Sequence, residues 1–116
     1  MTTPDEFLPL DPKSFHILVA LARGASHGYA IRQEVEARTA GEVRLWPATL
    51  YGTLAELARR GLIQETASPG GPDDDPRRRY YAITALGREV LAAEAARLES
   101  LARLARTHLA SGEAPS

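Results

Sequence analysis

Residues 47–63 read PATLYGTLAELARRGLI, and this stretch decides the fold. Pro47 suits the first position of a helix, where its missing backbone N–H costs nothing. Leu50, Leu54 and Leu57 follow at spacings of four and three residues, which places them on one helical face. The stretch therefore predicts a helix that buries a leucine face in a core.

The other side of this helix has small or hydrogen-bonding groups where a solvated helix usually carries long charged side chains. Its members are Thr49, Gly52, Thr53 and Glu56. Because short side chains allow another surface to come close, we expect this side to make an intermolecular contact.

Two further helices are predicted before this one. Asp11 followed by Pro12 is a helix start, since the carboxylate can cap the first turn. Ser26 is a plausible cap for a second, amphipathic helix. Residues 1–10 are expected to form a tail that Phe7, Leu8 and Leu10 could partly order.

Two short strands and a long helix are predicted after the deciding stretch. Residues 62–66 and 80–84 have strand character, and the segment between them, SPGGPDDDPR, consists of turn-forming residues. Thr84 is expected to cap a last helix, rich in Ala, Leu, Glu and Arg, that runs to about Leu109. Residues 110–116 are expected to be disordered.

The order α-α-α-β-β-α predicts a mainly α (α+β) fold, the winged helix-turn-helix. In this fold the third helix enters the major groove of DNA, and the loop between the strands, the wing, reaches the neighbouring backbone or minor groove. We assign residues 11–84 to this domain and residues 85–109 to a dimerisation helix.

The last helix carries an apolar seam that one small domain is too small to cover. Leu91, Leu98 and Ala105 are seven residues apart, and Ala95 and Leu101 extend the seam. The same helix of a second subunit is the simplest cover. We therefore predict a homodimer.

Composition narrows the class of protein. The chain has 116 residues, of which 44% are apolar and 25% are charged, as in a single soluble domain. It has no cysteine, which excludes disulfides, thiolate nucleophiles and cysteine-based zinc sites. No membrane-spanning run and no basic leader stand out, so we expect a cytoplasmic protein without a membrane partner.

Catalysis has no candidate residues in this sequence. The three histidines share no metal-ligand spacing. No nucleophile with a base, phosphate-binding glycine loop or carboxylate pair stands out. We therefore predict that the chain is not an enzyme and uses no metal or cofactor.

The net charge of −1 counts against a nucleic-acid binder, but the charges are unevenly distributed. Arg77, Arg78 and Arg79 form a basic triplet at the base of the predicted wing. We expect at least one of them to contact a DNA phosphate. The alternative is an ordinary solvated charge run.

An acidic tip lies within the predicted wing, where carboxylates beside phosphates would be repelled. It consists of Asp73, Asp74 and Asp75. Either the tip swings clear of DNA, which we favour, or it pairs with the arginine triplet when DNA is absent.

Three stretches of the chain resemble the PadR family of transcriptional regulators. They are HGYAI at 27–31, PATLYGTLAELARRGLI at 47–63 and RRRYYAITALGREVL at 77–91, in the family's order and at matching distances. The resemblance covers residues 13–109. It implies DNA binding through the third helix and the wing, a dimer made largely through the last helix, and usually repression. With a single dimerisation helix, the chain is similar to the family's short branch.

The groove-entry geometry and the resemblance together give candidate DNA contacts near the start of the third helix. They are Ala48, Thr49, Tyr51, Gly52 and Thr53. Tyr51 resembles the family's DNA-contacting tyrosine, with packing against the second helix as the alternative. For the two threonines the alternative is plain solvent exposure. The resemblance also implies that His27 is a structural residue at the start of the second helix.

Trp46, the only tryptophan, directly precedes the third helix. We interpret it as a hydrophobic plug, and the alternative is that it lines an effector pocket at the dimer interface. Other members of the family sense phenolic acids or lipophilic drugs, so the resemblance implies a small aromatic or lipophilic effector.

The predicted function is a dimeric, DNA-binding transcriptional regulator, a repressor that binds an inverted-repeat operator. Its half-sites would lie about one helical turn apart. One alternative is a winged-helix module that binds a protein partner, which the near-neutral charge favours. Another is a ligand-binding scaffold without a DNA role.

Overall fold

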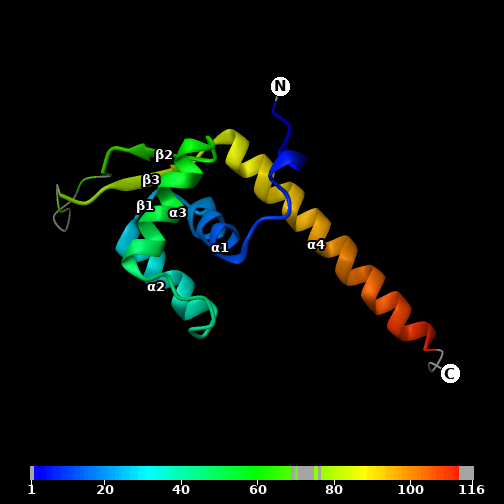
Figure 1. Ribbon diagram of the computed structural model, residues 1–116. Coiled ribbons are helices and arrows are strands. Elements are labelled where there is room, and N and C mark those ends of the chain that lie inside the picture. Colours follow the sequence, from blue (N-terminus) through cyan, green and yellow to red (C-terminus); the bar gives the residue numbers. More distant parts are fainter. Residues whose placement is uncertain (1, 69, 71–74, 76, 113–116) are drawn as a thin grey trace.

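The computed structural model describes residues 2–68, 70, 75 and 77–112. It confirms the predicted mainly α fold, with three helices, a two-stranded wing and a long last helix (Figure 1). In chain order the elements are η1 (Pro4–Phe7), α1 (Pro12–Ala22), β1 (Ser26–His27), α2 (Gly28–Arg38), α3 (Pro47–Arg59), β2 (Ile63–Thr66), β3 (Tyr80–Ile83) and α4 (Ala85–Ser111).

Two helix starts are capped as the sequence predicts. The Asp11 carboxylate accepts the backbone N–H of Ser14 at 3.1 Å and so caps α1. The Thr84 hydroxyl accepts the backbone N–H of Gly87 at 3.0 Å and so caps α4. Each cap satisfies a backbone donor that has no partner within the helix.

The predicted cap of α2 was wrong. Ser26 lies in β1, where its backbone pairs with Tyr81 of β3. The cap is His27, whose Nδ1 accepts the backbone N–H of Ala30 at 3.2 Å. Because Ser26 pairs with β3, α2 begins one residue later than predicted. The His27 imidazole caps the helix instead of the Ser26 hydroxyl.

The sheet has three antiparallel strands in the order β1-β3-β2. Strands β2 and β3 form the wing hairpin, with Ile63 opposite Ile83. Strand β1 was not predicted, because two residues are too few to show an alternating pattern. It ties the start of α2 to the base of the wing.

The core lies where α1, α2 and α3 meet the sheet. Leu50, Leu54 and Leu57 of α3 are buried, as predicted. The first turn of α4 crosses the chain that leaves α3, and a Cβ on Gly87 would overlap the carbonyl oxygen of Leu62. Only glycine therefore allows this crossing.

The amino-terminal segment is packed against the domain. Element η1 lies against α4 (Figure 1). Phe7 is buried beneath the Arg60 guanidinium, whose Cζ is 4.7 Å from the ring centroid. The backbone N–H of Leu10 donates to Oε2 of Glu94 at 2.8 Å. The segment thus connects the end of α3 to the middle of α4.

Helix α4 has 27 residues and projects from the body of the molecule (Figure 1). From Leu98 to residue 112 every side chain is exposed. The helix continues through residues 110 and 111, which the sequence analysis placed in a disordered end, while residues 113–116 lie outside the described part. None of the described helices is long and apolar enough to cross a membrane.

Candidate DNA interface

The exposed face of α3 is built from small side chains. Ala48, Gly52 and Ala55 are exposed along it, and Thr49 and Thr53 lie half-buried at its edge. The Thr53 hydroxyl donates to the Thr49 carbonyl at 2.8 Å, so this hydroxyl is already used within the helix. Sequence analysis placed the two threonines in this face and missed Ala55.

The far end of this face is charged. Arg59 is exposed there, and its Nε donates to Oε2 of Glu56 at 2.9 Å. The face therefore presents small groups near its amino end and an ion pair near its carboxyl end. The small side chains between Ala48 and Ala55 let an incoming surface approach this part of the helix closely.

The start of α3 is open to an anion. Trp46 occupies the cap position and makes no side-chain capping hydrogen bond. Backbone N–H groups in the first turn of a helix attract negative charge, a phosphate above all. This end of α3 adjoins the small-residue face.

Tyr51 packs against the start of α2. A Cβ on Gly28 would lie 3.0 Å from the Tyr51 hydroxyl oxygen and 3.2 Å from the nearest ring carbons. The absence of a side chain at Gly28 therefore makes room for the ring, which is still 52% exposed. The structure shows the packing alternative, and contact between the hydroxyl and DNA stays a prediction.

Each wing arginine lies near one partner and remains exposed. The pairs are Arg77 Nε with Asp75 Oδ1 at 3.2 Å, Arg78 Nη1 with His27 Nε2 at 3.3 Å, and Arg79 Nε with Glu65 Oε1 at 3.7 Å. The exposed ion pairs of Arg77 and Arg79 are weak and exchange readily with another anion. His27 carries no negative charge, so its contact with Arg78 is not an ion pair.

Asp75 belongs to the base of the wing. The Arg77 side chain and its backbone N–H hold the pKa of the Asp75 carboxyl below its ordinary value. For this residue the structure shows the second alternative, pairing with the arginine triplet. Asp73 and Asp74 lie outside the described residues.

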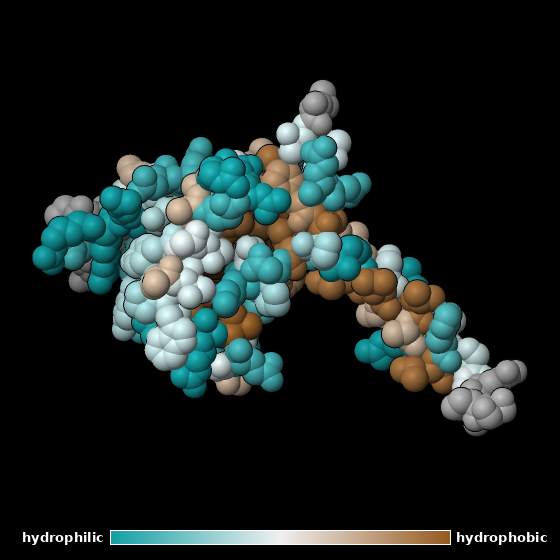
Figure 2. All heavy atoms as spheres, in the orientation of Figure 1, coloured by the Kyte–Doolittle hydropathy of each residue, from teal (hydrophilic) through white to brown (hydrophobic). Residues whose placement is uncertain are grey.

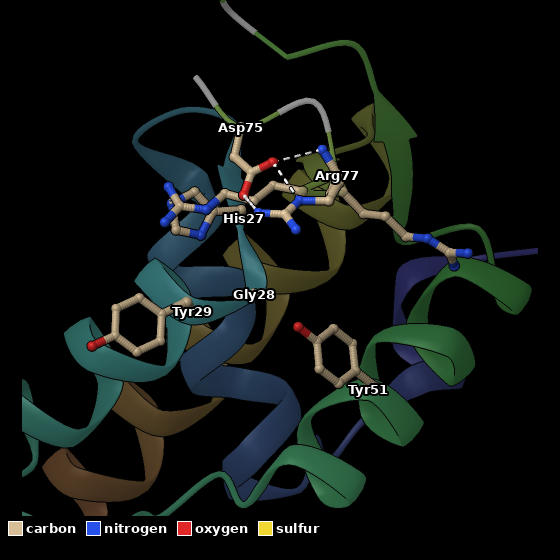
Figure 3. Close-up of a pocket in the computed structure, with 8 residues that line it drawn as sticks. His27, Gly28, Tyr29, Tyr51, Asp75 and Arg77 are labelled. Carbon is tan, nitrogen blue, oxygen red and sulfur yellow. Dashed lines mark hydrogen bonds and ion pairs between the residues drawn. The ribbon is translucent and has the colours of Figure 1, made fainter. Parts of the chain in front are cut away.

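One cleft brings these groups together. It has a volume of about 470 Å³ and lies between the base of the wing, the start of α2 and the side of α3. Its lining residues are His27, Gly28, Tyr29, Tyr51, Asp75, Arg77, Arg78 and Arg79 (Figure 3). Sequence analysis named Tyr51 and the arginines separately and missed Tyr29, although the HGYAI stretch contains it.

Trp46 is not a plug, because its side chain is 57% exposed. The Arg32 guanidinium lies over its ring, with Cζ 5.7 Å from the centroid. A second cleft, of about 740 Å³, opens beside it and is lined by the start of α1 and the loop before α3, including Lys13, Glu42 and Arg44.

The predicted dimerisation residues fall into two groups. Leu91 and Ala95 are half-buried, and Leu91 packs against the core of its own domain. Leu98, Leu101 and Ala105 are exposed on the projecting part of α4. Figure 2 shows hydrophobic residues along this part, to which Leu104 and Leu109 also belong, 53% and 79% exposed.

In the described part of the chain, no group of three or more His, Cys, Asp or Glu side chains is placed to hold a metal ion. The ionisable side chains of the wing cleft are mainly basic, which suits an anionic partner.

Three helices followed by a wing with arginines at its base define the chain as a winged-helix protein. Residues 17–93 match the model of the transcriptional regulator PadR-like family. The chain belongs to this family, as its three diagnostic stretches indicate. A family of transcriptional regulators agrees with the prediction that the chain is not an enzyme.

Two curated relatives are longer than the matched region. An uncharacterised 37.1 kDa protein in transposon TN4556 of Streptomyces fradiae is 41% identical over 88 residues, which are 76% of this chain and 22% of that protein. Uncharacterised protein X of Lysinibacillus sphaericus is 37% identical over 65 residues, 56% of this chain and 58% of that protein. The chain thus spans less than two thirds of either relative.

Solved structures show the same fold. A transcriptional regulator from Clostridium thermocellum is 25% identical, with a TM-score of 0.68 over 82% of this chain and 87% of that one. A PadR family regulator from Clostridium difficile R20291 is 22% identical, with a TM-score of 0.68 over 85% and 99%. A PadR-like transcription factor from Bacteroides fragilis is 20% identical, with a TM-score of 0.66 over 81% and 86%.

Proposed function

We propose that this protein binds duplex DNA as a homodimer, through α3 and the wing, and regulates transcription. The observation that carries the proposal is the cleft in which Tyr51 of α3 and the wing arginines converge (Figure 3). It adjoins a helix whose outer face is small enough to approach a surface closely.

Helix α3 and the wing cleft suit different parts of the DNA. The small side chains of α3 let its amino end enter the major groove, where base edges carry the sequence information. The arginines and the tyrosine hydroxyls suit phosphate oxygens, which fix the position of the protein on the duplex. The open start of α3 adds backbone N–H donors for another phosphate.

The dimer is proposed from the projecting half of α4. An isolated helical segment of this length is marginal in water, because most helical stability comes from packing. Leu98, Leu101 and Leu109 are 41%, 48% and 79% exposed along it. A second copy of α4 buries these side chains and places the two α3 helices about one helical turn apart on an inverted repeat.

Repression and release by an effector complete the proposal. A dimer that covers an operator blocks access to the promoter. A small aromatic or lipophilic molecule would stack on the exposed indole of Trp46, beside the 740 Å³ cleft. Because Trp46 is the cap residue of α3, a ligand there would shift the start of the DNA-binding helix.

The test is titration of the purified protein onto a random-sequence duplex at about 50 mM and about 200 mM salt, where each neutralised phosphate adds close to one unit to the salt slope. Recovery of a palindrome from a random pool would then define the operator. Arg79→Gln should lower the slope by about one unit, whereas Arg103→Gln, exposed on α4, should leave it unchanged.

The second candidate is a winged-helix module that binds a protein partner. The net charge of −1 favours it, since DNA-binding domains usually carry a basic excess. Absence of duplex binding at low salt, with a folded protein, would replace the first proposal with this one.

A further inference from the structure

His27 is committed to one tautomer by its place in the fold. Its Nδ1 accepts the backbone N–H of Ala30 and so caps α2. Burial, and then the charge of Arg78, lower the pKa of His27, which keeps the ring neutral near pH 7. A neutral imidazole has one donor and one acceptor, so the proton is on Nε2.

Arg78 faces that proton. Its Nη1 lies 3.3 Å from Nε2 of His27, and a guanidinium has only donors. Two donors at this separation form no hydrogen bond with each other, and both lack an acceptor in this contact. The arrangement is favourable only when an acceptor, best an anion, lies against both groups.

The acidic side chain in the same cleft is engaged elsewhere. Oδ1 and Oδ2 of Asp75 accept from Nε and Nη2 of Arg77, each at 3.2 Å. Asp75 is therefore not the acceptor for the side-chain donors of His27 and Arg78, and both of these residues line the same cleft as Tyr51.

We propose that His27 is a DNA-contacting residue, and that its Nε2–H and the Arg78 guanidinium together bind one backbone phosphate in this cleft. The inference rests on the proposed function and adds to it a neutral donor that sequence analysis had treated as purely structural. One phosphate oxygen accepts from His27 and a second from Arg78.

The backbone brings these two residues close together before DNA arrives. His27 in β1 pairs with Tyr80 in β3, only two residues beyond Arg78. The rings of His27 and Tyr80 also meet edge to face, with centroids 5.4 Å apart. Preorganised donors lose little conformational entropy on binding.

The test separates capping from phosphate binding. In His27→Ser the hydroxyl can still cap α2, but the donor toward Arg78 is gone. We expect the free energy of unfolding to change little and the duplex affinity to fall about tenfold, as for loss of a hydrogen bond to a charged acceptor. His16→Ser, in α1 beside Arg38 and outside the cleft, is the matched control.

Salt dependence gives a signature that a structural role would not produce. Arg78→Gln should lower the salt slope by about one unit, whereas His27→Ser should leave it unchanged, because a neutral donor releases no counterion. In the double variant the two losses should not add, since both residues bind the same phosphate. Wild-type affinity in a folded His27→Ser variant, or additive losses, would overturn the inference.

The failure of this inference is distinguishable from the failure of the proposed function. If the wild-type protein binds no duplex at low salt, the proposed function is wrong. Inorganic phosphate then tests the paired donors directly, through the proton and nitrogen resonances of His27 Nε2–H. A titratable shift in the wild type that is absent in Arg78→Gln supports the site, and no shift overturns it.

Discussion

Gly52 and Gly87 both lie inside helices, but an added side chain would clash with the fold only at Gly87. At Gly87 a Cβ would overlap the Leu62 carbonyl oxygen, so the fold itself requires glycine. At Gly52 no atom lies within 4 Å of the position that a Cβ would occupy, although glycine inside a helix costs about 1 kcal/mol relative to alanine. Packing within the chain therefore does not explain Gly52, whereas the proposed close approach of DNA to α3 would.

Gly52→Ala should accordingly have opposite effects on the stability of the protein and on its affinity for duplex DNA. We expect the free energy of unfolding to rise by about 0.5–1 kcal/mol, from the higher helix propensity of alanine. Duplex affinity should fall, because the added methyl would stand in the middle of the face that we propose enters the groove. Urea unfolding and duplex titration measure the two effects on the same preparation.

Gly87→Ala is the contrasting control, and it should destabilise the protein by several kcal/mol, roughly as overpacking a core does. Unchanged DNA affinity in a more stable Gly52→Ala variant would show that this part of α3 stays outside the groove.

At this scale, side chains whose roles are local were predictable. The buried leucines of α3 follow from helical spacing, and the Asp11 and Thr84 caps from residue type. The resemblance implied a structural role for His27 at the start of α2, and the structure confirms it. The capping contact of His27 and the exposure of Trp46 were not predictable, because they depend on segments distant in sequence. The pairing of β1 with β3 makes His27 the cap, and the loop before α3 leaves Trp46 exposed.

Among the elements, the amino-terminal segment and α4 share a buried carboxylate. Glu94 is 2% exposed, and its Oε2 accepts from the Leu10 backbone at 2.8 Å and from Arg97 Nη2 at 3.0 Å. The Arg97 hydrogen bond, aided by that of Leu10, holds the pKa of Glu94 below its ordinary value in spite of burial. This carboxylate fastens the segment to α4.

Glu94→Gln should therefore lower stability in a pH-dependent way. Because folding depresses the pKa, the stabilisation is fully present above the unfolded value of 4.5 and is lost as pH falls through the folded value. At pH 7 the variant should lose about 1–3 kcal/mol, as for a hydrogen bond to a charged group. The difference from wild type should shrink below about pH 4.5 in urea unfolding.

Glu99→Gln, at an exposed position five residues further along α4, controls for the change in net charge. An equal loss of stability at pH 7 and at low pH would contradict an ionised, paired Glu94.

Elements with enough residues to show a period were predictable, and shorter ones were not. Helix α3 carries its leucines at clear spacings, whereas β1 has two residues and η1 has four. The packing of η1 depends on Phe7 meeting Arg60 at the end of α3, a contact that no local pattern encodes.

For the whole molecule, the point at which α4 leaves its own domain decides which of its apolar residues stay exposed. The heptad spacing predicted an apolar seam, but not the point at which the chain's own core stops covering it. The structure places that point between Ala95, half-buried, and Leu98, exposed. Tertiary packing of η1 and α1 sets this boundary, so only the residues beyond it remain for a partner.

Leu98→Gln with Leu101→Gln should convert the proposed dimer to a monomer. Each leucine buried in an interface contributes about 1.5–3 kcal/mol, and the dimer has two copies of each, so the dissociation constant should rise at least about ten-thousandfold. Sedimentation equilibrium at micromolar concentration measures this change. Helical circular dichroism should also fall, because the projecting half of α4 frays without a partner.

Ala96→Gln and Thr107→Gln are the matched controls, since helical geometry places both on the face of α4 opposite Leu98. They should remain dimeric.

Loss of the dimer should also weaken binding to an inverted repeat. Each domain of the monomeric variant still binds one half-site, but the two domains no longer bind cooperatively. The affinity for the palindrome should therefore fall toward the affinity for a single half-site. A wild-type protein that sediments as a fully helical monomer would instead mean that the exposed leucines are covered by a different partner.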